Sequence, residues 1–124
     1  MQYSKKLQLK SERKKKKQKD LGRISTPVYN KVINRDKHKC VVCGSKTNLE
    51  CHHITSRGKM GEGTPENLCM LCHNCHFNKL HGQGDFYTKI RVFEYMISIG
   101  YTEYKNELEK LVIRMQALGI RRKS

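Results

Sequence analysis

Two Cys-x-x-Cys pairs constrain this chain more than any other feature of its sequence. Cys40 and Cys43 form one pair, Cys72 and Cys75 form another, and residues 44–71 lie between them. Four thiolates presented by two tight turns match the tetrahedral coordination of a structural zinc ion. A compact zinc ribbon separates its pairs by about 15 to 20 residues, so the longer insert predicts additional structure between these pairs.

Two further thiols leave the pairing open at this point. Cys69 forms another Cys-x-x-Cys pair with Cys72, and Cys51 is the sixth cysteine. Both lie on expected strands, where we interpret them as small buried hydrophobic residues. Because metal binding supplies folding energy to a domain with a small core, loss of any one zinc ligand is expected to unfold the centre of the domain.

The chain is strongly basic, with 26 Lys and Arg against 11 Asp and Glu over 124 residues, a formal net charge of +15. Such an excess is typical of proteins with a polyanionic partner, and nucleic acid is the first candidate. No apolar run approaches the roughly 18 residues of a membrane-spanning helix, and the N-terminus lacks the apolar core of a signal peptide. We therefore expect a cytoplasmic protein whose thiols stay reduced and bind metal.

Residues 1–23 hold ten Lys or Arg against two acids, which is more than half of the net charge. Such a block is expected to be a flexible arm that becomes neutralised on phosphates, although a solubilising or import-like tail has the same composition. The organisation predicted is an arm over 1–24, a core over 25–84, and a helical pair with a basic tail over 85–124. The arm residues expected to contact nucleic acid are Lys14, Lys15, Lys16 and Lys17.

The pattern of apolar and turn residues predicts an α+β fold. Thr26-Pro27 is a typical helix start, and residues 49–55 and the stretch "ENLCML" read as strands of an antiparallel hairpin with a long glycine-rich loop. A short helix is expected to follow the second cysteine pair and to end near Gly82. Apolar residues at helical spacing then predict two amphipathic helices that separate near Gly100.

The stretch "RDKHKCVVCG...LECHHITSRG...TPENLCMLCHNCHFNKLH" resembles the His-Asn-His (HNH) endonuclease family. Both cysteine pairs, the His-His pair, the Asn-Leu and the Cys-His occur in the family's order. The resemblance covers a little over a third of the chain. It implies a small zinc-stapled ββα-metal core, built from a hairpin and a helix, and it favours Cys72 and Cys75 as the second zinc pair.

Carried over position by position, the resemblance implies the catalytic roles. His52 and His76 would be ligands of the catalytic metal, His53 the general base, and Asn67 a residue that holds the imidazole by hydrogen bonding. Colicin-type relatives have a third histidine one helical turn after the second. By this analogy His81 is a further candidate ligand, although it follows His76 by five residues. Two imidazoles favour Mn²⁺, Ni²⁺, Co²⁺ or Zn²⁺ over Mg²⁺.

These residue types suit hydrolysis of a phosphodiester bond. Neutral imidazole is a base near physiological pH, and a divalent ion can neutralise charge on the phosphate and the leaving 3′ oxygen. The family implies products with 5′-phosphate and 3′-hydroxyl ends. Neighbours on a regular strand point to opposite faces, so His52 and His53 are expected to serve one phosphate only at the end or edge of the strand.

The expected substrate is double-stranded DNA, held through its backbone. Arg57 and Lys59 follow the histidine strand and are candidate phosphate contacts, although solvated loop charges read the same way. The alternatives left open are a non-catalytic zinc module that binds nucleic acid and an RNA-cleaving enzyme on the same core. A free-standing chain of this kind looks like a phage or mobile-element nuclease, and cutting both strands would require dimerisation or sequential binding.

Overall fold

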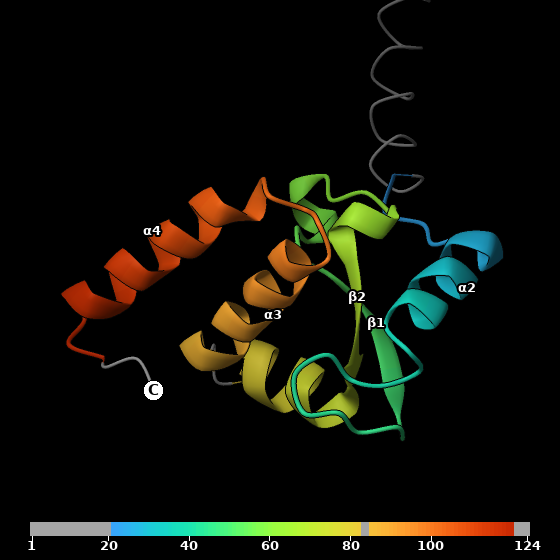
Figure 1. The fold of residues 1–124 in the computed structure, drawn as a ribbon, viewed down its shortest axis with the longest axis horizontal. Coiled ribbons are helices and arrows are strands. Elements are labelled where there is room, and N and C mark those ends of the chain that lie inside the picture. The colour runs from blue at the N-terminus through green and yellow to red at the C-terminus, as the bar shows by residue number, and fades with distance from the viewer. Residues whose placement is uncertain (1–20, 83–84, 121–124) are drawn as a thin grey trace, which may run out of the picture.

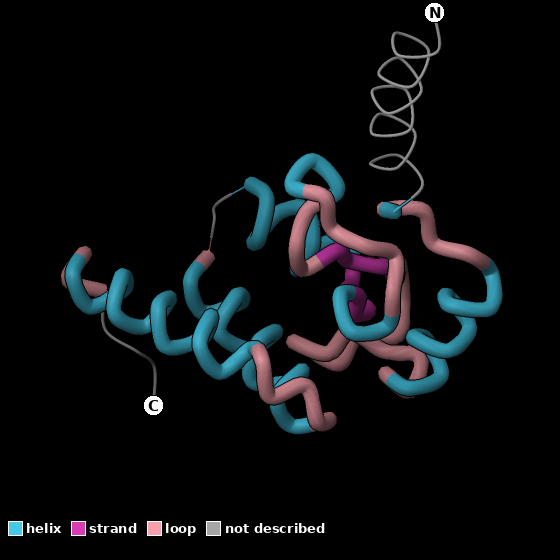
Figure 2. The backbone as a smooth tube through the Cα atoms, turned by 90° about the horizontal axis from the view of Figure 1, so that it is seen from above, coloured by secondary structure: helices cyan, strands magenta, loops and turns pink. Residues whose placement is uncertain are grey.

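The computed structural model describes residues 21–82 and 85–120, with backbone only for 81 and 82. The elements are α2 (Thr26–Arg35), β1 (Leu49–His53), β2 (Leu68–Cys72), the π-helical segment η3 (Asn74–Gly82), α3 (Phe86–Ser98) and α4 (Tyr104–Ala117). Helix α2 lies on one side of the hairpin and α3 on the other, with α4 beyond α3 (Figure 1). Figure 2 shows the same order from above, with helices flanking two short strands. This arrangement confirms the α+β prediction.

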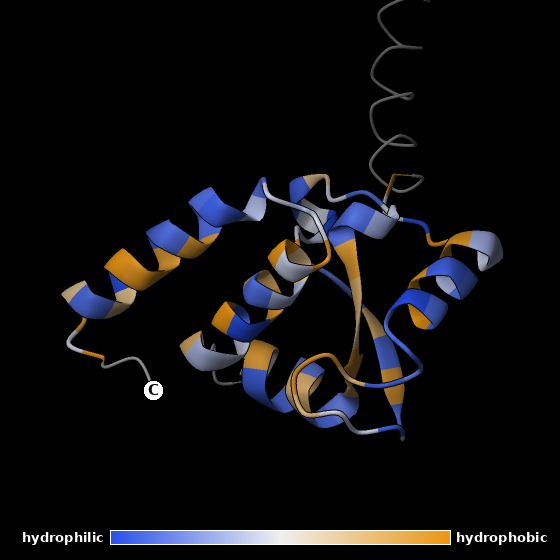
Figure 3. Cartoon of the chain, in the orientation of Figure 1, coloured by the Kyte–Doolittle hydropathy of each residue, from blue (hydrophilic) through white to orange (hydrophobic). Residues whose placement is uncertain are grey.

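Strands β1 and β2 pair antiparallel, with Leu49 opposite Cys72 and His53 opposite Leu68. All five residues of β2 are buried, whereas those of β1 are half-buried, and β2 is almost entirely hydrophobic in Figure 3. The outer edge of β2 is occupied, because the Val41 amide donates to the Met70 carbonyl at 3.0 Å. The predicted hairpin is therefore present, with a first strand that ends at His53 instead of residue 55.

The long loop between the strands is closely packed. It contains two 3₁₀ turns, Arg57–Lys59 and Pro65–Asn67. A Cβ atom at Gly61 would lie 1.8 Å from the Thr55 carbonyl oxygen, and one at Gly63 would lie 2.0 Å from the Arg23 carbonyl oxygen. These two glycines let the loop fold back on the end of β1 and on the segment that precedes α2.

A buried carboxylate joins α2 to the hairpin and to α3. Asp36 follows α2 directly and is 2% exposed. It accepts hydrogen bonds from the Met70 amide at 2.8 Å, from the Tyr95 hydroxyl, and from Arg35 Nε at 2.8 Å. Burial is the main cause that raises the pKa of the Tyr95 hydroxyl, and the hydrogen bond to Asp36 raises it further. The hydroxyl therefore keeps its proton and stays a donor. Three elements thus depend on one side chain.

The Arg35 guanidinium extends this network to the start of β2. It donates to the carbonyl oxygens of Pro65 and Leu68, each at 2.6 Å. Burial alone would lower the pKa of Arg35, but its hydrogen bond and ion pair with Asp36 raise it, so the side chain stays charged. Arg35 and Asp36 thus compensate each other's charge, and neither charge is buried without a partner.

The two C-terminal helices pack on the core, as their apolar periodicity predicts. In α3, Ile90, Val92 and Met96 are buried, and in α4 Met115 is fully buried. The rings of Phe93 and Tyr104 lie 5.7 Å apart between the helices. No helix of the described residues is long and apolar enough to cross a membrane. Dimerisation through these helices stays a prediction.

Substitution Asp36→Ala should destabilise the zinc-loaded protein by about 3–5 kcal/mol, because it leaves the Arg35 charge partly buried without its partner. Tyr95→Phe should cost less, about 1.5–3 kcal/mol, because it removes a single hydrogen bond to a charged acceptor. Urea titration gives the free energies of unfolding. Glu109→Ala, at an exposed acid of α4, is the control and should have little effect. Equal stability of all three variants would contradict the role given to Asp36.

Candidate functional site

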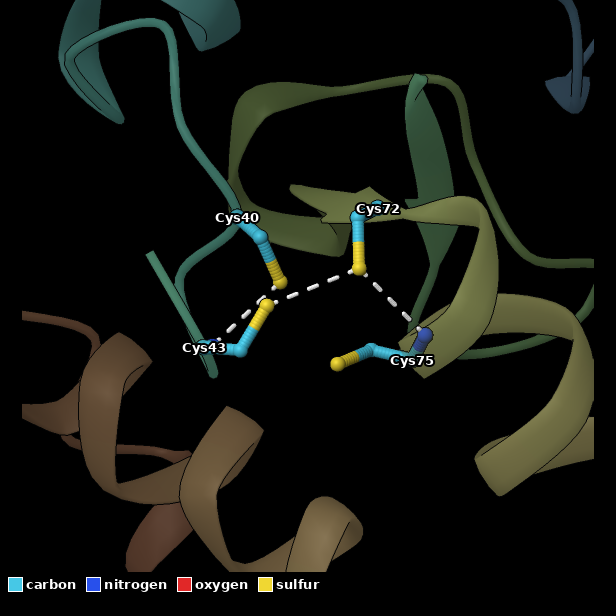
Figure 4. Close-up of side chains that lie close together, drawn as sticks. All are labelled: Cys40, Cys43, Cys72 and Cys75. Atoms are coloured by element: carbon cyan, nitrogen blue, oxygen red, sulfur yellow. Dashed lines mark hydrogen bonds between the residues drawn. The ribbon is translucent and has the colours of Figure 1, made fainter. Parts of the chain in front are cut away.

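The four predicted zinc ligands come together beside the hairpin. The sulfur atoms of Cys40, Cys43, Cys72 and Cys75 all lie within 4.8 Å of one another, and they face a common centre in Figure 4. The sulfurs of Cys43 and Cys72 are 3.6 Å apart. A tetrahedral zinc ion with Zn–S bonds of about 2.3 Å separates its sulfurs by about 3.8 Å. The geometry therefore fits a structural zinc site.

Backbone amides help to prepare these thiols for metal. The amide of Cys43 lies 3.5 Å from the sulfur of Cys40, and the amide of Cys75 lies 3.5 Å from the sulfur of Cys72. Burial opposes ionisation of Cys40, but backbone hydrogen bonds outweigh it and lower the pKa of this thiol to about 7. Burial and the neighbouring thiols raise the pKa of Cys75. Binding of a metal ion would supply the remaining charge compensation.

The other two cysteines lie outside the cluster. Cys69 is fully buried and Cys51 is half-buried, each packed among apolar side chains. Burial raises the pKa of Cys69 well above its ordinary value and that of Cys51 to about 11. Both behave as the small hydrophobic residues that the sequence predicts, and Cys72 pairs with Cys75 in the cluster.

His52 and His76, predicted to share a catalytic metal, lie side by side. Their ring centroids are 5.0 Å apart and the rings meet edge to face at 68°. The Nδ1 atom of His76 lies 2.7 Å from a carboxylate oxygen of Glu50. In the neutral ring that donates this bond, the lone pair is on Nε2, which is the arrangement a metal-binding histidine needs. The two rings are therefore candidate ligands of one divalent ion.

Glu50, which the sequence pattern did not single out, contacts two histidines. It also accepts a hydrogen bond from His73 Nδ1 at 2.8 Å, and its hydrogen bonds to His73 and His76 lower the pKa of the carboxyl group. The ionised carboxylate only accepts hydrogen bonds, so it orients both rings. Glu50 precedes His52 by two residues and therefore lies on the same face of β1, a signal that strand alternation contains.

His53 is held by a part of the chain that lies far from it in sequence. Its Nε2 atom is 2.7 Å from the carbonyl oxygen of Gly22. A carbonyl oxygen only accepts, so Nε2 carries the proton and Nδ1 of the neutral ring carries the lone pair. Gly22 is buried against the loop, where an added Cβ would lie 2.4 Å from Arg57 Nε. The segment before α2 therefore sets the tautomer of the histidine predicted to be the base.

The predicted hydrogen bond from Asn67 to the His53 imidazole is replaced by bonds to backbone. Asn67 is 7% exposed and ends the turn just before β2, not within the strand. Its Nδ2 donates to the carbonyls of Thr55 at 3.1 Å and Glu62 at 2.8 Å, and its Oδ1 accepts from the Thr55 amide at 2.7 Å. Both N–H donors are thus used on backbone. Asn67 fixes the loop directly after His53 and reaches the imidazole only indirectly.

Both strand histidines line one cavity of about 500 Å³ at the end of β1. Neighbouring side chains on a regular strand point to opposite faces. His53 is the last residue of β1, and both rings reach the cavity at this end of the strand. Lys59 lines the same cavity, whereas Arg57 packs near Gly22. Side chains from α3 and α4 complete the lining.

Some predicted residues lie outside the described part of the chain. These are Lys14, Lys15, Lys16, Lys17 and the side chain of His81. The backbone of η3 is π-helical, and hydrogen bonds in a π-helix join residues five apart, which is also the offset from His76 to His81. Within residues 21–80 and 85–120, the four-cysteine cluster is the group of three or more metal-ligating side chains close enough to hold an ion.

With this geometry, the comparison with known families identifies the class of the site. Residues 40–82 match the family model described as HNH endonuclease. The class is therefore that of phosphodiester hydrolases that act on nucleic acid and use a divalent metal. This segment of the chain, which contains the cysteine cluster, both strands and η3, is an HNH endonuclease domain. No curated protein matches the chain in a sequence search.

The protein should bind one zinc ion per chain through the cysteine cluster. Cys75→Ala should lose this zinc and most of the folded structure, because binding of the metal is coupled to folding. Cys69→Ala is the control, since it removes the competing thiol from the core and should keep one zinc with a moderate loss of stability. Zinc content is measured by atomic emission and folding by circular dichroism. Zinc retained in Cys75→Ala but lost in Cys69→Ala would reverse the assignment.

Proposed function

We propose that this protein is a metal-dependent endonuclease that hydrolyses phosphodiester bonds of double-stranded DNA, with His53 as the general base. One observation carries the proposal. His52 and His53 line the same cavity, and the Gly22 carbonyl engages Nε2 of His53, which makes Nδ1 its proton acceptor. A basic group with a defined tautomer in a cavity next to a pair of metal-ligating rings is suited to activating water.

In the proposed reaction, Nδ1 of His53 takes a proton from the attacking water. Nδ1 is the nitrogen of this tautomer that carries the lone pair, so it can accept the proton. As the ring becomes positively charged, its Nε2–H bond to the Gly22 carbonyl strengthens, because hydrogen bonds from charged donors are stronger than those from neutral ones. Gly22 would therefore stabilise the protonated base as well as orient it.

His52 and His76 would hold the catalytic divalent ion, with Glu50 orienting the His76 ring and His81 as a further candidate ligand. When bound, this ion would neutralise charge on the scissile phosphate and on the leaving 3′ oxygen. The proposed products carry 5′-phosphate and 3′-hydroxyl ends. Imidazole ligands favour Mn²⁺, Ni²⁺, Co²⁺ or Zn²⁺ over Mg²⁺ in this position.

Substitution His53→Ala should reduce the cleavage rate by about 10²- to 10⁴-fold, because it removes the general base. The measurement is nicking or linearisation of supercoiled plasmid by protein that keeps its structural zinc and is supplied with each divalent ion in turn. Binding of DNA and zinc content should stay close to those of the wild type. The control is His38→Asn, at an exposed position with φ of +54°, which Asn tolerates.

Three outcomes would contradict the proposal in different ways. Equal weak activity in wild type and His53→Ala would indicate a contaminating nuclease. Binding of DNA without cleavage under any metal would indicate a zinc module that only binds nucleic acid. Cleavage of RNA in preference to the plasmid would keep the role of His53 and change the substrate.

Substitution Gly63→Ala tests whether the Gly22 carbonyl positions the base. The added methyl group would meet the Arg23 carbonyl oxygen at 2.0 Å and push the segment 22–23 away from the loop. Loss of a hydrogen bond to a charged group costs about 1.5–3 kcal/mol, so the cleavage rate should fall about ten-fold or more. Gly58→Ala lies in the same loop with no atom within 4 Å of the added Cβ, and it should cleave like the wild type. Equal rates in both variants would remove Gly22 from the mechanism.

A further inference from the structure

The cavity beside the histidines has a second wall, and this wall lies outside the matched HNH segment. The cavity is also lined by Lys89 of α3 and by Lys110 and Arg114 of α4. Together with Lys59 of the loop, they place four cations around the cavity. The acid among the lining residues is Glu107. The cavity is therefore strongly positive before any metal ion binds.

The cations of α4 are available to a ligand. Lys110 and Arg114 are four residues apart and so lie on one face of the helix, and both are exposed. Glu107 Oε1 lies 3.8 Å from Lys110 Nζ. The side chain of Glu107 is 55% exposed and that of Lys110 is 75% exposed. An exposed pair at this distance is weak and screened by salt, so it competes little with a phosphate for Lys110.

The packing of the helices fixes the backbone from which the cations of α4 extend. The Tyr104 hydroxyl, at the start of α4, donates to the carbonyl oxygen of Glu66 in the loop before β2. Tyr104 also packs on Phe93, and Met115 is fully buried between Lys110 and the end of α4. In Figure 1, α4 extends from the body beyond α3. The helix is therefore anchored at both ends of its basic face.

We propose that Lys89, Lys110 and Arg114 form a phosphate-binding wall that holds the DNA backbone next to the scissile phosphate. The inference rests on the proposed function and extends its substrate site to the C-terminal helices. Cations on a preformed surface bind successive backbone phosphates, and Arg114 can engage two phosphate oxygens at once. Phe93 and Leu111 also line the cavity and supply an apolar surface for sugar or base.

Such contacts fix the position of the strand without reading its sequence. A substrate strand lying between Lys59 and α4 would pass both histidines, because all of these side chains line one cavity. The C-terminal helical pair would then be part of the enzyme's substrate site. This role also accounts for basic residues on the cavity face of α4, where packing on the core does not require them.

The test compares two triple variants, both built in a His53→Ala background so that DNA stays intact. The cavity variant carries Lys89→Gln, Lys110→Gln and Arg114→Gln. The matched variant carries Lys31→Gln, Lys105→Gln and Arg91→Gln, which removes the same charge from residues of α2, α4 and α3 that do not line this cavity. Affinity for a short DNA duplex is measured by fluorescence anisotropy from about 0.05 to 0.2 M salt.

Each lost phosphate contact reduces the slope of log affinity against log salt by about 0.9. The slope of the cavity variant should therefore be smaller than that of the His53→Ala parent by about 2 to 3, and its affinity should be weaker by ten-fold or more. The matched variant should change the slope by less than about one. Equal losses in the two variants, an unchanged cavity variant, or a parent that does not bind DNA would each overturn the proposed wall.

Cleavage by the protein with an intact His53 separates this inference from the proposed function. Absence of metal-dependent cleavage, together with a selective loss of binding in the cavity variant, would refute the nuclease mechanism and leave the phosphate-binding wall in place. Cleavage together with equal losses in the two triple variants would support the nuclease and refute the wall.

Discussion

The convergence of four thiols on one point is the constraint on which the rest of the structure depends. Cys40 and Cys43 lie in the loop after α2, and they meet Cys72 at the end of β2 and Cys75 in the first turn of η3. Because His76 follows Cys75 directly, the cluster also sets the start of the helix that faces β1. The hairpin register then places His52 beside His76. A cysteine cluster whose geometry fits a structural zinc ion thus positions the residues proposed to bind a catalytic ion.

The side chains proposed to act in catalysis are held mostly by backbone atoms and by residues that have no proposed chemical role. The Gly22 carbonyl accepts a hydrogen bond from His53. The side-chain amide of Asn67 forms hydrogen bonds with the backbone of Thr55 and Glu62. Asp36 holds α2 against β2 and so keeps the segment before α2 within reach of the site. The stability of this small core and the geometry of the site are therefore parts of one network.

Much of the fold could be predicted because its signals are local. The cysteine spacing, the apolar strands and the helical periodicity of the C-terminal residues predicted the hairpin, the helices and the cluster, with ends displaced by one or two residues. The roles of Gly22 and Asp36 could not be predicted in the same way, and strand alternation places Glu50 on the face of His52 without showing its contacts with His73 and His76. Each acts through a contact between segments that are 23 to 34 residues apart, and a linear pattern does not show such contacts.

The sequence by itself determined the chemistry of this protein: its four thiols, its paired histidines and its excess of positive charge follow from composition and spacing alone. Only the tertiary structure decided which atom of His53 carries the proton and that Asn67 binds backbone. It also decided that cations of α3 and α4 line the cavity beside the histidines. The physical reason is that hydrogen bonds and cavities depend on the distances between folded segments, whereas the capacity to bind metal or phosphate belongs to each side chain.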